Sequence, residues 1–275
     1  MFQWYVPIVV CSATGYRCFN SALDVLPIPA PPGKYSGKER YRWRNAITSL
    51  FNSALMSVIT LYCWFSHPQI WTDPMGDFPT LGGSRLRTMD LPGKSAALYR
   101  PRKSPIGYNS VVADAGLAVM SGYVLYDTYD ILMYTDLSKV FALITHHVTV
   151  AVVIFMVSYE TIGIGVLYIA LLTEVHAIFL HSRQLLIMYG VSKSSTLYSV
   201  HKSINLVTFV VLRLVPLLFA LYCFCTMINR NFFALYYILP CFSAVICTIN
   251  FVLLWRLLRS DFLVTNGKDG NILED

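Results

Sequence analysis

The sequence predicts an all-α protein that crosses a membrane several times, and its composition and segment lengths carry this prediction. Hydrophobic residues make up 56% of the 275-residue chain and charged residues 13%, whereas a soluble domain carries about 25% charged residues. The mean hydropathy is +0.55. Apolar stretches recur at the length that a helix needs to cross the hydrocarbon layer, without the alternation of a barrel strand. Seven such stretches can be drawn, at residues 3–25, 45–66, 111–134, 138–158, 161–182, 204–227 and 233–256.

The first stretch is the weakest of the predicted spans, because Arg17 and Asn20 interrupt it. Two interpretations are open, a cleaved signal peptide and a retained helix. A signal peptide has a basic start and a small-residue cleavage site, and neither is evident here. We therefore expect residues 1–26 to form an N-terminal transmembrane anchor.

Lysine and arginine predict the orientation of the chain, because basic residues collect on the cytoplasmic side of a membrane protein. Residues 27–44 form a basic linker, residues 68–109 a long loop rich in Gly, Pro and Ser, and residues 260–275 a tail. A cytoplasmic linker places the N-terminus and the long loop outside and the tail in the cytoplasm. The basic residues of the linker are Lys34, Lys38, Arg40, Arg42 and Arg44.

Charge and cysteine placement argue against several classes of partner. The formal net charge is +6, but no basic stripe lies on a soluble domain, so nucleic acid is not expected as a partner. The seven cysteines lie in or beside apolar stretches and form no paired zinc-type or CxxC motif. We expect no metal site and no required cofactor.

A pair of adjacent histidines, His146 and His147, lies inside an otherwise apolar stretch. An ionisable side chain at bilayer depth is costly and tends to face a cavity or a polar partner. A neutral imidazole can act as a general base or nucleophile near pH 7, and His147 is slightly preferred for that role. The alternative is that both rings form hydrogen bonds with tyrosines for packing. Neighbouring side chains point about 100° apart on a helix, so only one ring is expected to face the interior fully.

The segment before the doublet carries two carboxylates. Asp127 and Asp130 are three residues apart and share a helix face. Tyr123 and Tyr126 lie on or near that face and could form hydrogen bonds with them. Asp127 either orients a group in a cavity or is structural, and for Asp130 we favour a place near the cytoplasmic end, capped by water or by Lys139.

The segments after the doublet add further ionisable groups. Glu174 and His181 are seven residues apart and therefore share one stripe of a helix. Arg213 follows in the next apolar stretch and is expected to pair with a buried carboxylate such as Glu174, since an unpaired charge there would be costly. No HExxH spacing appears, which agrees with the absence of a predicted metal site.

The cost of charge at bilayer depth predicts that these groups converge. We expect one of the two histidines to share a cavity with Asp127 and Glu174, and Arg213 to approach it. The candidate catalytic residues are His147, His146, Asp127 and Glu174, and the candidate substrate-binding residues are Tyr123, Tyr126, His181 and Arg213.

Four segments between Lys38 and Arg259 resemble the TLC family, which includes translocating-chain-associating proteins, ceramide synthases and lipid-sensing proteins. They are WRNAITSLFNSAL, SGYVLYDTYDILMY, LITHHVTV and LLTEVHAIFLHSRQLL. Within the family the sequence is most similar to the membrane-fluidity regulators. The resemblance implies a six-helix TLC-type bundle at residues 38–259, with the N-terminal transmembrane helix outside it. It also implies a multi-pass protein of the plasma membrane, with the endoplasmic reticulum as the alternative, that limits incorporation of long polyunsaturated fatty acids into phospholipids. Its partners would be membrane lipids and lipid-remodelling enzymes.

The resemblance also suggests an enzyme, because ceramide synthases are acyltransferases that use the histidine doublet and a downstream HDxSD-like motif. Here Thr173 and Glu174 stand at the first two positions of that motif and Ala177 at the second acid, while Asn52 stands where the fluidity regulators would have a histidine. The implied alternative is an acyltransferase with acyl-CoA as substrate, whose phosphates would meet basic side chains at the cytoplasmic face. The basic side chains that would bind these phosphates are Arg183, Lys193 and Lys202.

A lipid or ion transporter is a further alternative, because the chain has ionisable residues that could be coupled.

Overall fold

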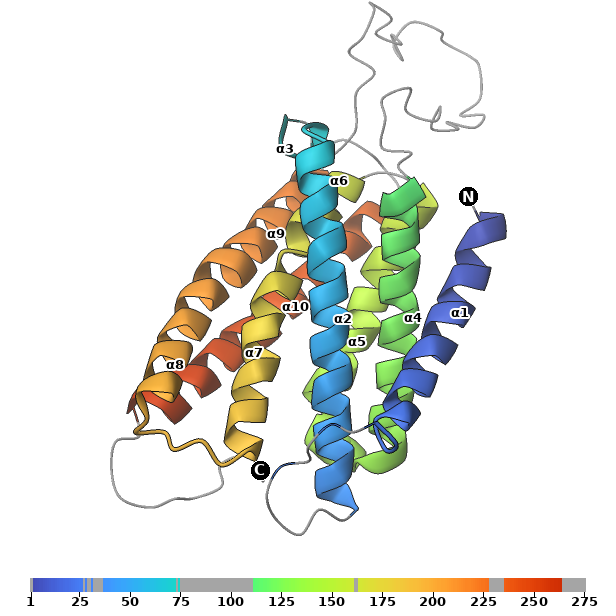
Figure 1. Ribbon diagram of the computed structural model, residues 1–275. Coiled ribbons are helices and arrows are strands. Elements are labelled where there is room, and N and C mark those ends of the chain that lie inside the picture. Colours follow the sequence, from blue (N-terminus) through green and yellow to red (C-terminus); the bar gives the residue numbers. More distant parts are fainter. Residues whose placement is uncertain are drawn as a thin grey trace, which may run out of the picture.

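The computed structural model describes residues 2–26, 28, 31, 37–72, 74, 111–160, 163–227 and 235–263, and every regular element among them is helical (Figure 1). Two short stretches, η1 and η2, are π-helical and continue α-helices. The elements are α1 (Phe2–Ala22), α2 (Lys38–Ser66), α3 (Gln69–Thr72), α4 (Val111–Tyr134), α5 (Leu137–Glu160), α6 (Ile164–Ala170), α7 (Thr173–Met188), α8 (Thr196–Phe209), η1 (Val210–Leu214), α9 (Val215–Met227), α10 (Leu235–Leu258) and η2 (Arg259–Leu263).

The helices confirm the prediction of a polytopic helical membrane protein. Five helical stretches of the described chain are long and apolar enough to cross a membrane. The helices α1 and α4, with 21 and 24 residues, are not among the five. Both carry charged side chains, and Arg17 of α1 forms an ion pair with Asp130 of α4. The five stretches are Glu39–Ser66, Leu137–Ser158, Ile164–Met188, Thr196–Thr226 and Tyr237–Leu263.

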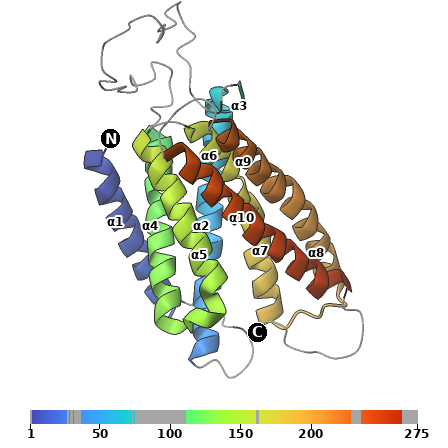
Figure 2. The ribbon, with the colours of Figure 1, turned by 180° about the vertical axis from the view of Figure 1, so that it is seen from behind.

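The long helices form a bundle with α1 at one edge and the α8–η1–α9 rod at the opposite edge (Figures 1 and 2). The helix α1 packs mainly on α4, and α2 packs on both α4 and α7. The helix α10 packs on α5 and α9 and crosses the bundle obliquely, as the view from behind shows (Figure 2). The helices α5 and α8–α9 run toward the end of the bundle that holds α3 and α6, here called the α3/α6 end, whereas α7 and α10 run away from it.

Polar residues attach α1 to its neighbours, although in the sequence they weakened the first predicted span. Arg17 Nη1 lies 3.1 Å from Asp130 Oδ1, and Asn20 Nδ2 donates to Thr48 Oγ1 at 3.3 Å. Water or Lys139 was expected to cap Asp130, and the ion pair with Arg17 shows that Lys139 is not its partner. The partner comes from another helix because α1 lies along the buried face of α4.

A small residue lets α1 and α4 approach closely. A Cβ atom added to Gly122 would lie 2.6 Å from both Ser12 Cβ and the Val9 carbonyl oxygen. Ser12 Oγ also donates to the Val119 carbonyl oxygen at 2.9 Å. Close backbone approach through small residues is a common way for helices to associate in membranes, where apolar surface alone gives little preference for protein over lipid.

The helix α2 begins well before its apolar part, so residues 38–44, assigned from the sequence to both the linker and the TLC-like domain, are helical. Trp43 is buried there, and Arg40 and Arg44 bind Asp24, at 2.8 and 2.5 Å. Most of the remaining linker, residues 75–110 of the long loop and residues 264–275 of the tail lie outside the described residues.

Two predicted spans are irregular in the middle. The fifth is divided, because α6 ends at Ala170 and α7 begins at Thr173. The sixth begins at Thr196 rather than at 204, after Ser195, whose side chain accepts a hydrogen bond from the Tyr198 backbone N–H. It then passes through the π-helical η1. Pro216 is the second residue of the following helix α9. Because proline lacks an N–H and its ring clashes with the preceding turn, a widened turn before it accommodates the ring.

Candidate functional site

A pocket lies between α4, α5, α6, α7, η1, α9 and α10, with an empty volume of about 710 Å³ that includes space open to the outside. Most of its wall is apolar. Bilayer-depth cavities with this lining suit hydrocarbon chains better than polar solutes. Apolar side chains from α4, α5, α6, α9 and α10 line most of the wall, among them Val153, Leu167, Leu217, Phe224 and Ile246.

The polar side chains of the pocket gather at one depth. His146, Glu174, Arg213 and Asn250 come from four different helical segments. On each helix the apolar lining residues lie on the side of these groups that faces the α3/α6 end, given the helix directions in Figures 1 and 2. Ser243 is a polar exception in that part of the wall. The pocket is therefore amphipathic along its length.

Arg213 is held by an amide instead of a carboxylate. Its Nε donates to Asn250 Oδ1 at 2.5 Å, and its guanidinium carbon lies 5.7 Å from the centre of the Phe209 ring. Arg213 and Glu174 line the same pocket, as expected, but they form no ion pair within 4 Å. Their opposite charges interact across the pocket without a direct contact, because the hydrogen bonds of Glu174 go to α2.

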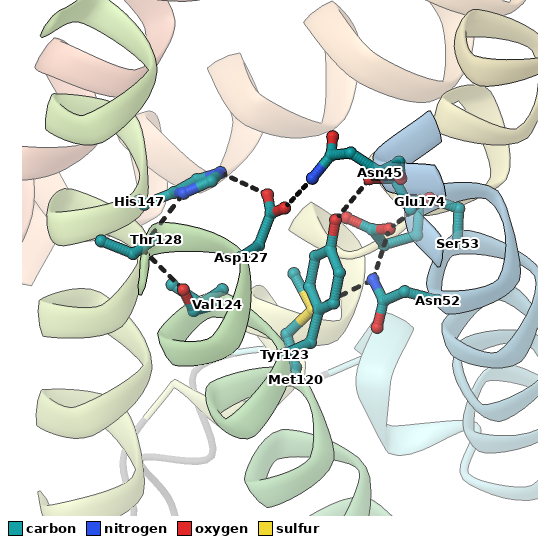
Figure 3. A network of polar contacts seen from close by, with 11 residues as sticks. Asn45, Asn52, Ser53, Met120, Tyr123, Val124, Asp127, Thr128, His147 and Glu174 are labelled. Carbon is teal, nitrogen blue, oxygen red and sulfur yellow. Dashed lines mark hydrogen bonds and ion pairs between the residues drawn. The ribbon is translucent and has the colours of Figure 1, made fainter. Parts of the chain in front are cut away.

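Glu174 lies in the first turn of α7, directly after the break from α6. Its Oε2 accepts from Ser53 Oγ at 2.9 Å and from Asn52 Nδ2 at 3.5 Å (Figure 3). Asn52 is itself oriented by Tyr16 of α1, whose hydroxyl donates to Asn52 Oδ1 at 2.8 Å. A carboxylate near a helix N-terminus is favoured by the helix dipole, and these donors compensate its burial.

A second polar group holds Asp127 and His147. His147 Nε2 lies 3.5 Å from Asp127 Oδ2, and Asn45 Nδ2 donates to Asp127 Oδ1 at 2.7 Å (Figure 3). The Thr128 hydroxyl donates to the Val124 carbonyl oxygen at 2.6 Å and contacts His147 Nδ1 at 3.2 Å. Since that hydroxyl has one proton to give, Nδ1 must carry the hydrogen of the second contact. A proton shared between His147 Nε2 and the Asp127 carboxylate then makes the contacts of the ring with both Thr128 and Asp127 favourable.

The two histidines of the doublet thus belong to two different polar groups, one around Asp127 and one in the pocket. The two ring centres lie 5.9 Å apart, with His147 turned to Asp127 and His146 in the wall of the pocket. The predicted single cavity is therefore divided, because Asp127 does not line the pocket with Glu174. The turn of about 100° between adjacent helix positions accounts for the division.

The predicted substrate-binding residues other than Arg213 lie away from the pocket wall. Tyr123 and Tyr126 pack around the Tyr16 ring, with centroids 5.1 and 6.0 Å away, and the Tyr123 hydroxyl donates to Ser49. His181 is partly buried two turns beyond Glu174. Their role in binding stays a prediction. Across the described ranges, no group of three or more His, Cys, Asp or Glu side chains is placed to hold a metal ion.

Sequence reasoning missed the amides and hydroxyls that complete both polar groups. Those on α2 recur at helical spacing, and all of them except the partly buried Asn45 are buried, so a search for a polar stripe in an apolar helix would have found them. Asn250 interrupts the apolar α10 and gave a weaker signal of the same kind. The polar stripe of α2 consists of Asn45, Ser49, Asn52, Ser53, Ser57 and Thr60.

Helices of membrane-spanning length around buried polar groups and an amphipathic pocket define a polytopic membrane protein. The sequence model of the TLC domain matches residues 42–259. The chain therefore belongs to the TLC-domain family. It is 30% identical to TLC domain-containing protein 2 of Danio rerio over 90% of this chain and 86% of that protein. It is 24% identical to human TLC domain-containing protein 1 over 94% of this chain and 90% of that protein. No solved structure matches the chain.

Proposed function

We propose that this protein regulates the acyl composition of membrane phospholipids, and thereby bilayer fluidity, by limiting the incorporation of long polyunsaturated fatty acids. The observation that carries the proposal is the amphipathic pocket, whose polar groups lie at one depth and whose apolar wall leads away from them. Family membership supports a lipid-related role. The proposed setting is the plasma membrane, with membrane lipids as ligands and lipid-remodelling enzymes as partners.

The pocket gives this regulation a physical basis. A polar end buried among apolar helices favours a ligand that has one polar group and one hydrocarbon chain. An acyl chain inside the pocket would be withheld from, or presented to, the enzymes that esterify it. Chain selection would follow from the shape of the wall, because close packing discriminates between straight and bent hydrocarbon.

The test is lipid analysis of cells with and without the protein, supplied with an isotope-labelled polyunsaturated fatty acid. Loss of the protein should raise the labelled share of phospholipid acyl chains, and re-expression should restore it. Val150→Trp, which fills the pocket wall, should fail to restore it, whereas Val148→Trp on the exposed face of the same helix should succeed. Identical acyl profiles with and without the protein would disprove the proposal.

An acyl-CoA-dependent acyltransferase is the second candidate function, and the position of His146 favours it. His146 lines the pocket, whereas His147 is held by Asp127 and Thr128. For this candidate function we therefore propose His146 as the general base, in place of His147, which was slightly preferred from the sequence. The base would take the proton of an acceptor hydroxyl as its oxygen attacks the thioester carbonyl carbon. The C–S bond breaks, the CoA thiolate receives the proton, and Arg213 would stabilise the oxyanion.

Purified protein with labelled acyl-CoA and a lysophospholipid tests the enzymatic candidate directly. Transfer should be seen with the wild type and fall by about 10²-fold or more in His146→Ala. A positive result with His146→Ala equal to wild type would reject His146 as the base. Absence of transfer, together with altered acyl profiles in cells, would favour regulation without catalysis.

A further inference from the structure

Two charged groups face the same pocket with hydrogen-bonding capacity left over. Arg213 uses Nε for Asn250, and its Nη1 and Nη2 atoms have no acceptor in the part of the chain that the structure describes. Glu174 uses Oε2 for Ser53 and Asn52, and its Oε1 likewise has no donor among described residues. The two opposite charges line one pocket without forming an ion pair, so a polar group that lies between them would satisfy both.

The chemistry of that group follows from what each side chain needs. The Arg213 fork offers parallel N–H donors, which match a planar group with two oxygens. Glu174 needs a hydrogen-bond donor. A carboxylic acid meets both needs, because its two oxygens accept from the fork while its proton is shared with Glu174. The three groups together then carry no net charge, and an uncompensated charge at bilayer depth is avoided.

The rest of the pocket fits an unbranched hydrocarbon chain. Apolar residues continue from Arg213 along α9 to Phe224 and from Glu174 back along α6 to Leu167. The distance from Arg213 to Phe224 is about 16 Å at a helical rise of 1.5 Å per residue. A phosphodiester headgroup carries one negative charge and has no proton to share with Glu174, so that together with Glu174 and Arg213 it would leave one negative charge uncompensated. The site therefore favours one chain with a small acid group.

We propose that the pocket binds a free fatty acid, with its carboxyl group between Arg213 and Glu174 and its chain directed toward the α3/α6 end. This inference rests on the proposed function in one respect, that a lipid occupies the pocket. It adds the class of ligand, the two residues that recognise its headgroup and the direction of its chain.

Binding of radiolabelled oleic acid to the purified full-length protein in a non-ionic detergent tests the headgroup. Saturable binding is expected, with unlabelled oleic acid competing at least tenfold better than methyl oleate or oleyl alcohol. Arg213→Ala should weaken binding at least tenfold, and Arg256→Ala, at an exposed position on α10, should not. Equal competition by the methyl ester would overturn the proposal. Stronger competition by oleoyl lysophosphatidic acid would overturn it in favour of a phosphate ligand.

A second pair of variants tests the chain and does not depend on the folding of the arginine variant. Leu217→Trp places a large ring in the wall next to Arg213, whereas Leu218→Trp places the same ring on the exposed side of α9. The first should abolish oleic acid binding and the second should preserve it. Equal binding by both would overturn the proposal. The binding assay and the cellular lipid analysis test the two proposals independently. Altered acyl profiles without oleic acid binding would reject only the proposed ligand. Oleic acid binding without altered acyl profiles would reject only the proposed function.

Discussion

Arg17 of α1 forms an ion pair with Asp130 of α4, with 3.1 Å between Nη1 and Oδ1. The Asp130 side chain is 1% exposed, whereas that of Arg17 is 46% exposed. A carboxylate so far removed from water depends on its partner, because removing one member of such a pair leaves a buried charge. The charged residue that interrupts the first helix therefore couples that helix to the bundle.

Arg17→Ala should lower the free energy of unfolding by about 1–3 kcal/mol, less than for a fully buried pair because the arginine remains half-exposed. Thermal unfolding of the purified protein in detergent, followed by circular dichroism, should show an apparent Tm lower by about 2–4 °C per kcal/mol. Adding Asp130→Asn should recover part of the loss, since the unpaired charge is then gone. Strict additivity of the two single changes would show that the pair is not coupled.

Gly122 and Gly15 offer a matched comparison at and near the same helix contact. Gly122→Ala should destabilise the protein by about 1–3 kcal/mol, because its Cβ would meet the Val9 backbone oxygen at 2.6 Å. Gly15→Ala should be neutral or stabilise by up to about 1 kcal/mol, because it lies within α1 and nothing lies within 4 Å of its added Cβ. The same unfolding measurement compares the two. Equal effects would mean that α1 does not approach α4 as described.

The helical membrane architecture follows from the sequence because length and hydropathy are local properties. The stretch at residues 111–134 was predicted with the bounds of α4. The divided α6–α7 segment and the π-helical η1 could not be read in the same way. An apolar run looks uniform in sequence whether or not the backbone is regular, and only Pro216 signalled a disturbance.

The sequence predicted the charged residues of the candidate site but not their hydrogen-bond partners. The cost of an ionisable group at bilayer depth singled out Glu174 and Arg213, and both line the pocket. Their hydrogen-bond partners depend on which helices are neighbours and on small rotations about each axis. Ser53 and Asn250 are recognisable as polar residues in apolar helices, but nothing local showed which charged side chain each of them binds.

Arg183 was expected to meet the phosphates of acyl-CoA, but it is bound to Asp261 and Ser260 of η2. The Asp261 carboxylate also accepts from the Tyr198 hydroxyl at 3.0 Å. These contacts join the ends of α7, α8 and α10, and the Asp261 side chain is fully buried. Arg183 therefore has a structural role at this end of the bundle.

Arg183→Ala should cost about 3 kcal/mol, the lower part of the range for breaking a buried pair, because Tyr198 still donates to the carboxylate. Faster trypsin cleavage after Arg259 should accompany the lower apparent Tm, as η2 loses its anchor. Arg256→Ala serves as the control, because Arg256 is exposed in the last turn of α10, just before η2, and this change should alter stability by about 0.5 kcal/mol or less. An Arg183→Ala protein with wild-type stability would contradict a structural role for this pair.

The two histidines of the doublet should separate into a structural residue and a pocket residue. His147→Ala removes the ring beside the buried Asp127, leaves Asn45 as its donor, and should cost about 2–3 kcal/mol. His146→Ala removes a ring from the pocket wall, where no ion pair is lost, and should cost about 1 kcal/mol or less. Thermal unfolding of the two variants measures this difference.

The effects of the two histidine variants on function should be the reverse of their effects on stability when both are expressed at the same level. Cells that express His146→Ala should keep the acyl profile of cells lacking the protein, because the changed side chain faces the ligand. His147→Ala should restore the normal profile in proportion to the folded protein present, since the pocket wall is intact. Adding Asp127→Asn to His147→Ala should recover stability by removing the unpaired carboxylate. If His147→Ala were as stable as wild type yet inactive, His147 would be the functional member of the doublet.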